Sequence, residues 1–190
     1  MNNYELFYLV SLTLAVFIYF YFFYSNYHNK KIVKDKMTNK EVIRLILINV
    51  FILIPLISYF YMKKYNYEIP AAIRNLAPLI MLLALICIIQ TSYDLGNEYS
   101  YTLQVRKNHK LVTTGIYKYI RHPMYFCGLL FIIAQSLLIP NLIGNISNLI
   151  VMFVFWNGRI QDEENMMIKE FGNKYLKYMN NTKSVIPFIL

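Results

Sequence analysis

Residues 109–125 form a polar stretch that leads directly into an apolar segment and carries two histidines, His109 and His122. A histidine changes its charge near neutral pH, so it can move a proton or hydrogen-bond a ligand. Two histidines could also begin a metal site, but no third ligand follows at a spacing typical of zinc sites. We therefore expect no metal, and ligand binding or proton transfer instead. Tyr117 and Tyr125 in the same stretch could serve such a site or belong to an aromatic belt at a membrane surface.

A second group of reactive side chains lies near the C-terminus and consists of Arg159, Glu163 and Glu164. Arg159 and Glu163 are four residues apart, so they share one face of a helix. On an exposed surface such an ion pair is worth only about 0.3–0.5 kcal/mol. The same pair could instead do chemistry, with the arginine holding an anionic group and the carboxylate holding a cationic or hydroxyl-rich ligand. The residues alone leave both interpretations open.

The elements that must position these groups are apolar. The chain is 57% hydrophobic and 15% charged, whereas soluble domains are about a quarter charged. Its apolar residues form long blocks, several of about 20 residues, the length that a helix needs to cross a hydrocarbon core of ~30 Å. The blocks are 6–24, 42–62, 71–92, 123–139 and 142–156. We predict an all-α integral membrane protein, a polytopic bundle of about five transmembrane helices with a cytoplasmic C-terminal helix.

Prolines and glycines predict where these helices bend and end. Pro55 and Pro78 each lack a backbone donor and should kink or locally open their helices. Pro123 fits the first turn of a helix. The last two apolar blocks are short and are separated by residues 140–141, which predicts a tight helical hairpin. A polar helix should follow from Gly158 to Glu170, break at residues 171–172 and resume.

Lys and Arg are distributed very unevenly among the connections. Of the 19 in the chain, sixteen lie in alternate connections and only three in the others. Because cytoplasmic loops carry the excess of Lys and Arg, we predict that the N-terminus is outside and the C-terminus is cytoplasmic. The segments 94–122 and 158–183 then share the cytoplasmic side, where they could close on each other across the hairpin. The net charge of +9 fits such loops beside anionic lipid, and no pattern of a nucleic-acid-binding domain accompanies it.

The ordered motifs resemble the isoprenylcysteine carboxyl methyltransferase family and its bacterial relatives, a wider group that includes phospholipid N-methyltransferases and part of the sterol reductases. The match covers roughly 94–190. Its parts are Leu95-Gly96 with Ser100, His109-x-Leu-Val-x-x-Gly115-x-Tyr117, Arg121-His122-Pro123-x-Tyr125, Arg159-x-x-x-Glu163-Glu164, Phe171-Gly172-x-x-Tyr175-x-x-Tyr178 and Ile186-Pro187. The family often has Trp where this chain has Tyr99. We expect one domain, 1–190, with three transmembrane helices in 1–93 and the functional half in 94–190.

This resemblance implies a membrane methyltransferase that uses S-adenosylmethionine. It implies that Arg159 and Glu163 are catalytic residues and that Arg159 faces the methyl acceptor. The implied cofactor-binding residues are Gln104, His109, Lys110, Leu111, Val112, Tyr117, His122, Pro123, Met124, Tyr125 and Glu163.

The acceptor remains open at this point. A carboxylate of a prenylcysteine-like or other lipidic molecule needs no general base, only a cation such as Arg159 to place it. A phospholipid or other amine must first lose a proton, for which Glu163 or Glu164 could serve. A reductase would need nicotinamide binding, and a scaffold that binds anionic lipid would explain the charge but not the motif order. The expected partners are the lipidic acceptor and membrane lipids, with no nucleic acid and no obligate protein partner. A composition rich in Ile, Asn, Lys and Tyr favours a bacterial plasma membrane.

Overall fold

The computed structural model describes residues 2–28, 53–96 and 110–186. The expectations for Gln104 and His109 lie outside these residues. The helices are α1 (Asn3–His28), a helical stretch at 53–61, η1 (Lys63–Tyr65), α3 (Ala71–Arg74), α4 (Ala77–Leu95), η3 (Gly115–Lys118), α5 (Pro123–Leu138), α6 (Leu142–Phe171) and α7 (Asn173–Asn181). The predicted all-helical class is confirmed for the described chain.

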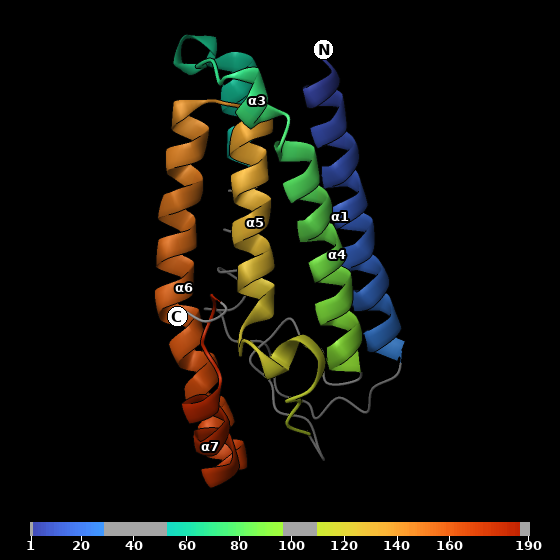
Figure 1. The fold of residues 1–190 in the computed structure, drawn as a ribbon, viewed down its shortest axis with the longest axis vertical. Helices are drawn as coiled ribbons and strands as arrows, with labels where there is room; N and C mark the ends of the chain where they lie inside the picture. The colour runs from blue at the N-terminus through green and yellow to red at the C-terminus, as the bar shows by residue number, and fades with distance from the viewer. Residues whose placement is uncertain (1, 29–52, 97–109, 187–190) are drawn as a thin grey trace.

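The long helices run side by side along the long axis of the molecule (Figure 1). Helix α4 packs against both α1 and α5, and α5 packs against α6. The N-terminus lies at one end of this bundle, while η3 and α7 lie at the opposite end, called the lower end below (Figure 1). The lower part of α6 extends past the end of α4 and is joined there by α7.

Within the described part of the chain, two stretches are long and apolar enough to cross a membrane, Asn3–Phe22 and Ala71–Leu95, and Pro123–Leu138 is a shorter apolar helix. Many of the apolar side chains on these helices point outward. For example, Phe17 is 68% exposed and Leu79 is 64% exposed. A bundle that presents apolar side chains outward fits a surface covered by lipid tails rather than by water. With 16 residues, α5 is only ~24 Å long, shorter than a hydrocarbon core of ~30 Å.

The third apolar block differs from the prediction at Pro78. The chain turns at Asn75 and Leu76, which divides the block into α3 and α4. Pro78 therefore lies in the first turn of α4, where its missing N–H would have had no helical partner in any case. The predicted kink at Pro78 is wrong, because the helix begins there. Pro123, in contrast, opens α5 as predicted.

The predicted hairpin between the last two apolar blocks is confirmed, and Asn141 fixes it. This side chain is fully buried. Its amide donates to the carbonyls of Ser58 and Met62, at 3.2 and 3.3 Å, and to Asn66 Oδ1 at 2.7 Å. Its own oxygen accepts from the N–H of Gly144 at 3.1 Å, which caps α6. One side chain thus joins the α5–α6 turn to the helical stretch at 53–61 and the chain that follows it.

Helix α6 runs without a break from the apolar block into the polar segment, over 30 residues, a length of ~45 Å. It ends at Phe171, and Gly172 follows with φ of 53°, a left-handed conformation that favours glycine. Helix α7 then begins at Asn173, so the predicted break at 171–172 is confirmed. Arg159 and Glu163 are therefore carried by a continuous helix rather than by a loop.

Candidate active site

The two segments predicted to close on each other do so at the lower end. Ile120 and Lys183 form a parallel β-bridge. The N–H of Arg121 donates to the carbonyl of Lys183 at 2.8 Å, and the N–H of His122 donates to the carbonyl of Ser184 at 2.9 Å. This pairing holds the chain before α5 against the chain after α7.

His122 lies between two carboxylates of α6. It is the residue just before α5, and its side chain is only 7% exposed. Its Nδ1 lies 3.4 Å from Glu163 Oε2, and its Nε2 lies 3.1 Å from Glu164 Oε1. Both ring nitrogens can donate only in the imidazolium form. The geometry therefore favours a charged His122.

Glu163 accepts hydrogen bonds from two further side chains through its other oxygen. Arg159 Nε donates to Glu163 Oε1 at 2.8 Å, and the hydroxyl of Tyr125 donates to the same atom at 2.9 Å. Arg159 is buried, with 6% exposure. This is no isolated surface ion pair, because a buried arginine, a tyrosine and a histidine from two helices converge on one carboxylate. We call His122, Tyr125, Arg159 and Glu163 the central cluster.

The charges of the cluster support one another. Burial by itself lowers the pKa of His122, but hydrogen bonds to Glu163 and Glu164 outweigh it and raise that pKa above its ordinary value. Burial favours a raised pKa for Glu163, yet His122 and Arg159 reverse the effect and hold it below its ordinary value. His122 and Arg121 likewise lower the pKa of Glu164 against the effect of burial. The carboxylates of Glu163 and Glu164 thus both face His122, and each also faces a guanidinium, that of Arg159 for Glu163 and that of Arg121 for Glu164.

Arg121 and Glu164 support this cluster from behind, a role that the sequence reasoning missed. Arg121 donates through Nε and Nη2 to Glu164 Oε1, at 2.9 and 2.8 Å. Its Nη1 donates to the carbonyls of Met179, at 3.1 Å, and Thr182. Arg121 therefore joins α6 to the end of α7. Its place in the Arg-His-Pro motif, and that of Glu164 beside Glu163, were the available signals.

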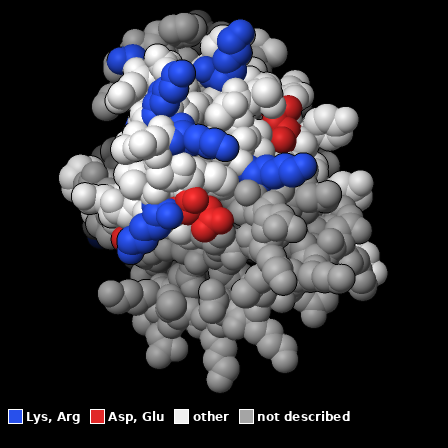
Figure 2. Space-filling model, turned by 90° about the horizontal axis from the view of Figure 1, so that it is seen from below, with Lys and Arg blue, Asp and Glu red and all other residues white. Residues whose placement is uncertain are grey.

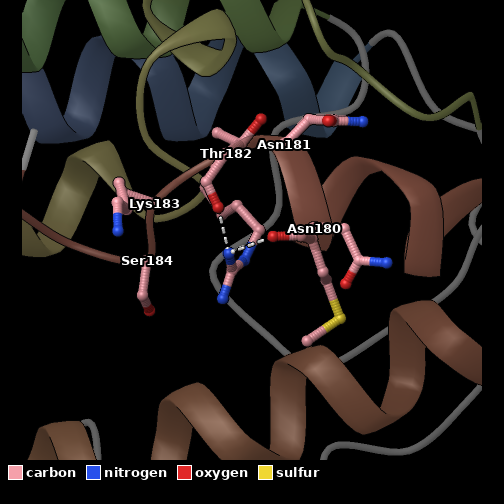
Figure 3. A pocket seen from close by; sticks show the side chains of 7 residues that line it. Asn180, Asn181, Thr182, Lys183 and Ser184 are labelled. Atoms are coloured by element: carbon pink, nitrogen blue, oxygen red, sulfur yellow. Dashed lines mark hydrogen bonds between the residues drawn. The ribbon is translucent and has the colours of Figure 1, made fainter. Parts of the chain in front are cut away.

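A small cavity of about 350 Å³ lies beside Arg121, lined by the end of α7 and the chain that follows it. Figure 3 shows Lys183 and Ser184 on one side and Asn180 and Asn181 on the other. The N–H groups of the Arg121 guanidinium donate to Glu164 and to two backbone carbonyls. The cavity therefore lies beside Arg121, which supports the central cluster, rather than beside the central cluster itself.

Trp156 adds an aromatic wall that was also missed. Its ring makes a T-shaped contact with the ring of Tyr125, with centroids 6.3 Å apart, and the Tyr125 ring in turn lies 5.6 Å from the ring of His122. Trp156 precedes Arg159 by three residues, so helical spacing could have placed it on this face.

The turn around Tyr117 lies at the same end. Tyr117 is buried within η3, and its carbonyl accepts a hydrogen bond of 2.6 Å from the hydroxyl of Tyr178 in α7. The preceding Gly115 has a φ of 61°. This conformation costs glycine little.

The structure thus brings together four of the predicted site residues, whereas Gln104 and His109 lie outside the described residues. Pro123 and Met124 lie in the first turn of α5, next to Tyr125. The residues at 110–112 lie outside any helix, with Lys110 exposed and Leu111 and Val112 half-buried. Within the described chain, no hydrogen bond or ion pair joins these three to the central cluster.

Several exposed lysines lie on the segments that lead into α5 and on the polar end of α6, α7 and the chain after it. They are Lys110, Lys118, Lys169, Lys174, Lys177 and Lys183. Figure 2 views the lower end and shows Lys and Arg side chains spread across its described part, with few acidic groups between them. Among the described residues, no group of three or more His, Cys, Asp or Glu side chains could hold a metal ion.

A sequence model of the isoprenylcysteine carboxyl methyltransferase (ICMT) family matches residues 75–169, half of the chain. The chain belongs to this ICMT family. The match contains α4, η3, α5 and most of α6, and with them the whole central cluster.

Similar proteins carry the same family name. Protein-S-isoprenylcysteine O-methyltransferase B of Arabidopsis thaliana is 31% identical over 96 residues, which are 50% of this chain and 49% of that protein. The protein-S-isoprenylcysteine O-methyltransferase of Saccharomyces cerevisiae is 33% identical over 96 residues, 50% of this chain and 40% of that protein. The human enzyme is 30% identical over 99 residues, 51% and 35% of the two chains. The chain thus spans about half, or less, of the length of the curated relatives it matches.

The fold is also similar to a solved structure, that of the eukaryotic intramembrane Ras methyltransferase ICMT without a monobody. The TM-score is 0.57 at 23% sequence identity, and the similarity covers 82% of this chain and 55% of that chain. This likeness concerns the fold. It reaches well beyond the half of the chain that the sequence comparisons cover, and it places the apolar helices in the fold of an integral membrane protein.

The charged His122 of this ICMT family member predicts a loss of stability at alkaline pH. Its folded pKa is raised, so its stabilising contribution is fully present below the unfolded pKa of about 6.5. The contribution is lost as the pH rises through the higher folded value. Each unit of difference between the folded and unfolded pKa corresponds to ~1.4 kcal/mol of stability. Each kcal/mol changes the Tm of a chain of this size by roughly 2–4 °C. Thermal unfolding in detergent between pH 6 and pH 9 should show this fall in Tm.

A matched variant tests the origin of that fall. His122→Gln cannot titrate, so its Tm should stay flat over the same pH range while lying below the unmodified Tm at pH 6. On the acidic side the unmodified protein should lose stability as the pH falls through the lowered pKa values of Glu163 and Glu164. This acid loss should be smaller in His122→Gln, because His122 is the largest cause that lowers both pKa values. An equally steep alkaline fall in His122→Gln would contradict the assignment.

Proposed function

We propose that this chain catalyses S-adenosylmethionine-dependent methyl transfer to the carboxylate of a prenylcysteine-like or other lipidic acceptor. The observation that carries the proposal is the buried Arg159 at the point where α6 passes from its apolar to its polar half, paired with Glu163. A carboxylate at the head of an apolar molecule requires this combination, a cation for the head and apolar surface for the tail. Family membership and the names of the relatives agree with it.

The residues present fit S-adenosylmethionine chemically. The molecule has an amino-acid end with an ammonium and a carboxylate, a sulfonium and an adenine ring. Glu163 offers a carboxylate for a cationic group, and the rings of Tyr125 and Trp156 offer faces of the kind that attract cations. Tyr117, His122, Pro123, Met124 and the chain at 110–112 would complete the cofactor site, and we assign Gln104 and His109 to it as well.

In this mechanism the cofactor supplies an activated methyl group, and the protein supplies position. Arg159 holds the acceptor carboxylate, because a planar guanidinium matches a carboxylate in two parallel hydrogen bonds. Glu163 keeps Arg159 oriented through its 2.8 Å hydrogen bond. Alignment of two bound reactants can supply several kcal/mol of the barrier, roughly 7–11 in the best cases. A carboxylate is ionised at neutral pH, so no residue has to remove a proton.

The pKa directions in the site argue against an amine acceptor. An amine is protonated at neutral pH and needs a base before it can accept a methyl group. Glu163 and Glu164 are the carboxylates at hand, and the pKa of each is held below its ordinary value. A carboxylate made less basic in this way is a poor general base.

The arrangement also supports a direction in the membrane. The start of α5, the polar end of α6 and α7 lie toward the lower end, away from the N-terminus (Figure 1), and these elements carry the central cluster and several of the exposed lysines. Since positive loops stay in the cytoplasm, we place the site at the cytoplasmic face of the plasma membrane of a bacterium and the N-terminus outside. A soluble cofactor would then arrive from the cytoplasm, and the lipidic acceptor from the bilayer.

The test is methyl transfer by the purified protein in detergent with S-adenosylmethionine labelled in its methyl group. The acceptors are N-acetyl-S-farnesylcysteine and, separately, phosphatidylethanolamine. We expect label in the first, released as methanol by alkali because it is an ester. Label in phosphatidylethanolamine that resists alkali would support N-methylation instead. No binding of S-adenosylmethionine above that of Glu163→Ala would overturn the methyltransferase proposal.

A further inference from the structure

Asp94, in the last turn of α4, connects the membrane bundle to the turn that carries Tyr117. Its Oδ2 accepts a hydrogen bond of 2.8 Å from the backbone N–H of Ile116, 22 residues later in the chain. Its Oδ1 accepts one of 2.8 Å from Gln90 Nε2, one helical turn earlier in α4. Both oxygens of one carboxylate are therefore engaged, one within α4 and one in η3.

The contact is so close that position 115 has no room for a side chain while the Asp94 carboxylate stays in place. A Cβ on Gly115 would lie 2.1 Å from Asp94 Oδ2 and 2.4 Å from Asp94 Cγ, and the backbone there also has a φ of 61°. A side chain at position 115 would therefore have to displace this carboxylate and adopt a strained backbone conformation. The missing side chain and the positive φ of Gly115 thus allow the turn to lie directly against the Asp94 carboxylate.

The hydrogen bond from Ile116 to Asp94 gives a partner to an N–H group at the start of η3. The first N–H groups of a helix have no partner within it, and the N–H of Ile116 is such a group in η3. The accepting carboxylate comes from another element, α4. The turn that it holds contains the buried Tyr117, whose carbonyl accepts from Tyr178 of α7. Asp94 thus fixes one side of Tyr117 and Tyr178 fixes the other.

We propose that Asp94 is a positioning residue for the methyl donor: its carboxylate sets where the Gly115–Lys118 turn, and with it Tyr117, lies relative to the membrane helices. The inference rests on the proposed function, because Tyr117 is there assigned to the cofactor site. It adds a residue that has no place among the motifs of the sequence. Asp94 bonds only to its own helix and to this turn in the described structure, so its loss should disturb the turn and leave the bundle packed.

The experiment compares Asp94→Ala with Asp94→Asn in the full-length protein in detergent. The alanine removes the acceptor for the N–H of Ile116. The asparagine keeps an acceptor oxygen, and Gln90 can rotate its amide to match the new NH₂ group. Glu170→Ala is the matched control, because it removes one negative charge from an exposed residue near the end of α6. Binding of S-adenosylmethionine is followed by calorimetry and by the fluorescence of Trp156, the single tryptophan.

We expect Asp94→Ala to weaken S-adenosylmethionine binding about tenfold or more, the size expected for a hydrogen bond to a charged group. Asp94→Asn should stay within about threefold of the unmodified protein, and Glu170→Ala should not differ from it. In turnover the loss should fall on the KM for S-adenosylmethionine, with kcat and the KM for N-acetyl-S-farnesylcysteine nearly unchanged. Backbone amides of residues 114–118 should exchange faster in Asp94→Ala, with an unchanged Tm.

Equal binding by Asp94→Ala and the unmodified protein overturns this inference and leaves the proposed function in place. Equal weakening by Ala and Asn also overturns it, because charge rather than the hydrogen bond would then matter. A general fall in Tm with faster exchange throughout α4 and α5 overturns it in favour of a purely structural residue. Failure of the unmodified protein to bind S-adenosylmethionine overturns the proposed function, and this inference with it.

Discussion

Replacement of Arg159 by alanine is expected to reduce methyl transfer to a carboxylate acceptor by roughly a hundredfold to a thousandfold. Loss of one partner of a desolvated, hydrogen-bonded charge pair costs ~2–5 kcal/mol, and about 1.4 kcal/mol corresponds to each factor of ten. The affinity for S-adenosylmethionine should fall only a few-fold. Glu163 would still accept from Tyr125 at 2.9 Å and would still face His122 at 3.4 Å, so the rest of the cluster can stay in place.

Two further variants make the assignment of Arg159 specific. Arg159→Lys keeps the positive charge but cannot form two parallel hydrogen bonds, so its activity should lie between those of alanine and the unmodified protein. Lys169→Ala removes an exposed positive charge ten residues further along α6, and it should have normal activity. The measurements are kcat/KM for N-acetyl-S-farnesylcysteine and the Kd for S-adenosylmethionine. If Arg159→Ala loses both in equal measure, Arg159 belongs to the cofactor site instead.

Replacement of Glu163 by alanine is expected to weaken S-adenosylmethionine binding by about a hundredfold and to abolish measurable turnover. The carboxylate is the acceptor for Arg159 and Tyr125 and faces His122, so its removal leaves three donors without their shared partner. Groups left unsatisfied in this way cost ~1–3 kcal/mol each, and more when charged. The Tm should therefore fall together with the binding, and calorimetry and thermal unfolding measure the two effects.

A variant of Glu164 distinguishes a residue that binds the cofactor from one that only stabilises the structure around the site. It contacts His122 and Arg121, and Arg121 in turn holds the end of α7. Glu164→Gln should lower the Tm and loosen the chain after α7, with a smaller loss of S-adenosylmethionine affinity than Glu163→Gln. The opposite order of the two affinities would mean that Glu164, not Glu163, holds the cofactor.

The parts of this site that depend on local spacing could be predicted from sequence. The i,i+4 spacing of Arg159 and Glu163 gave their pairing, and the glycine at 172 marked the end of α6. Pro123 marked the start of α5. In each case the cause lies within a few residues, where backbone geometry decides.

Topology predicted that the segments 94–122 and 158–183 approach each other, but the individual contacts between distant residues could not be predicted. Arg121 bonds to the carbonyls of Met179 and Thr182, and every residue has a carbonyl, so such a partner leaves no sequence signal. Asp94 accepts a hydrogen bond from the backbone N–H of Ile116, and a backbone N–H likewise leaves no signal in the sequence. Pro78 was misread for a related reason, because one proline fits both a kink and a helix start, and only the turn at Asn75 decides between them.

The convergence of three donors on Glu163 has a consequence for how this site can change during evolution. Arg159, Tyr125 and His122 share a single partner, so the free-energy costs of changing them are not independent. Once one donor is lost, the carboxylate is already misplaced or incompletely bound, and a second loss costs less than it would alone. The four positions should therefore vary together among related sequences, and a chain that gives up Glu163 has little reason to retain the other three.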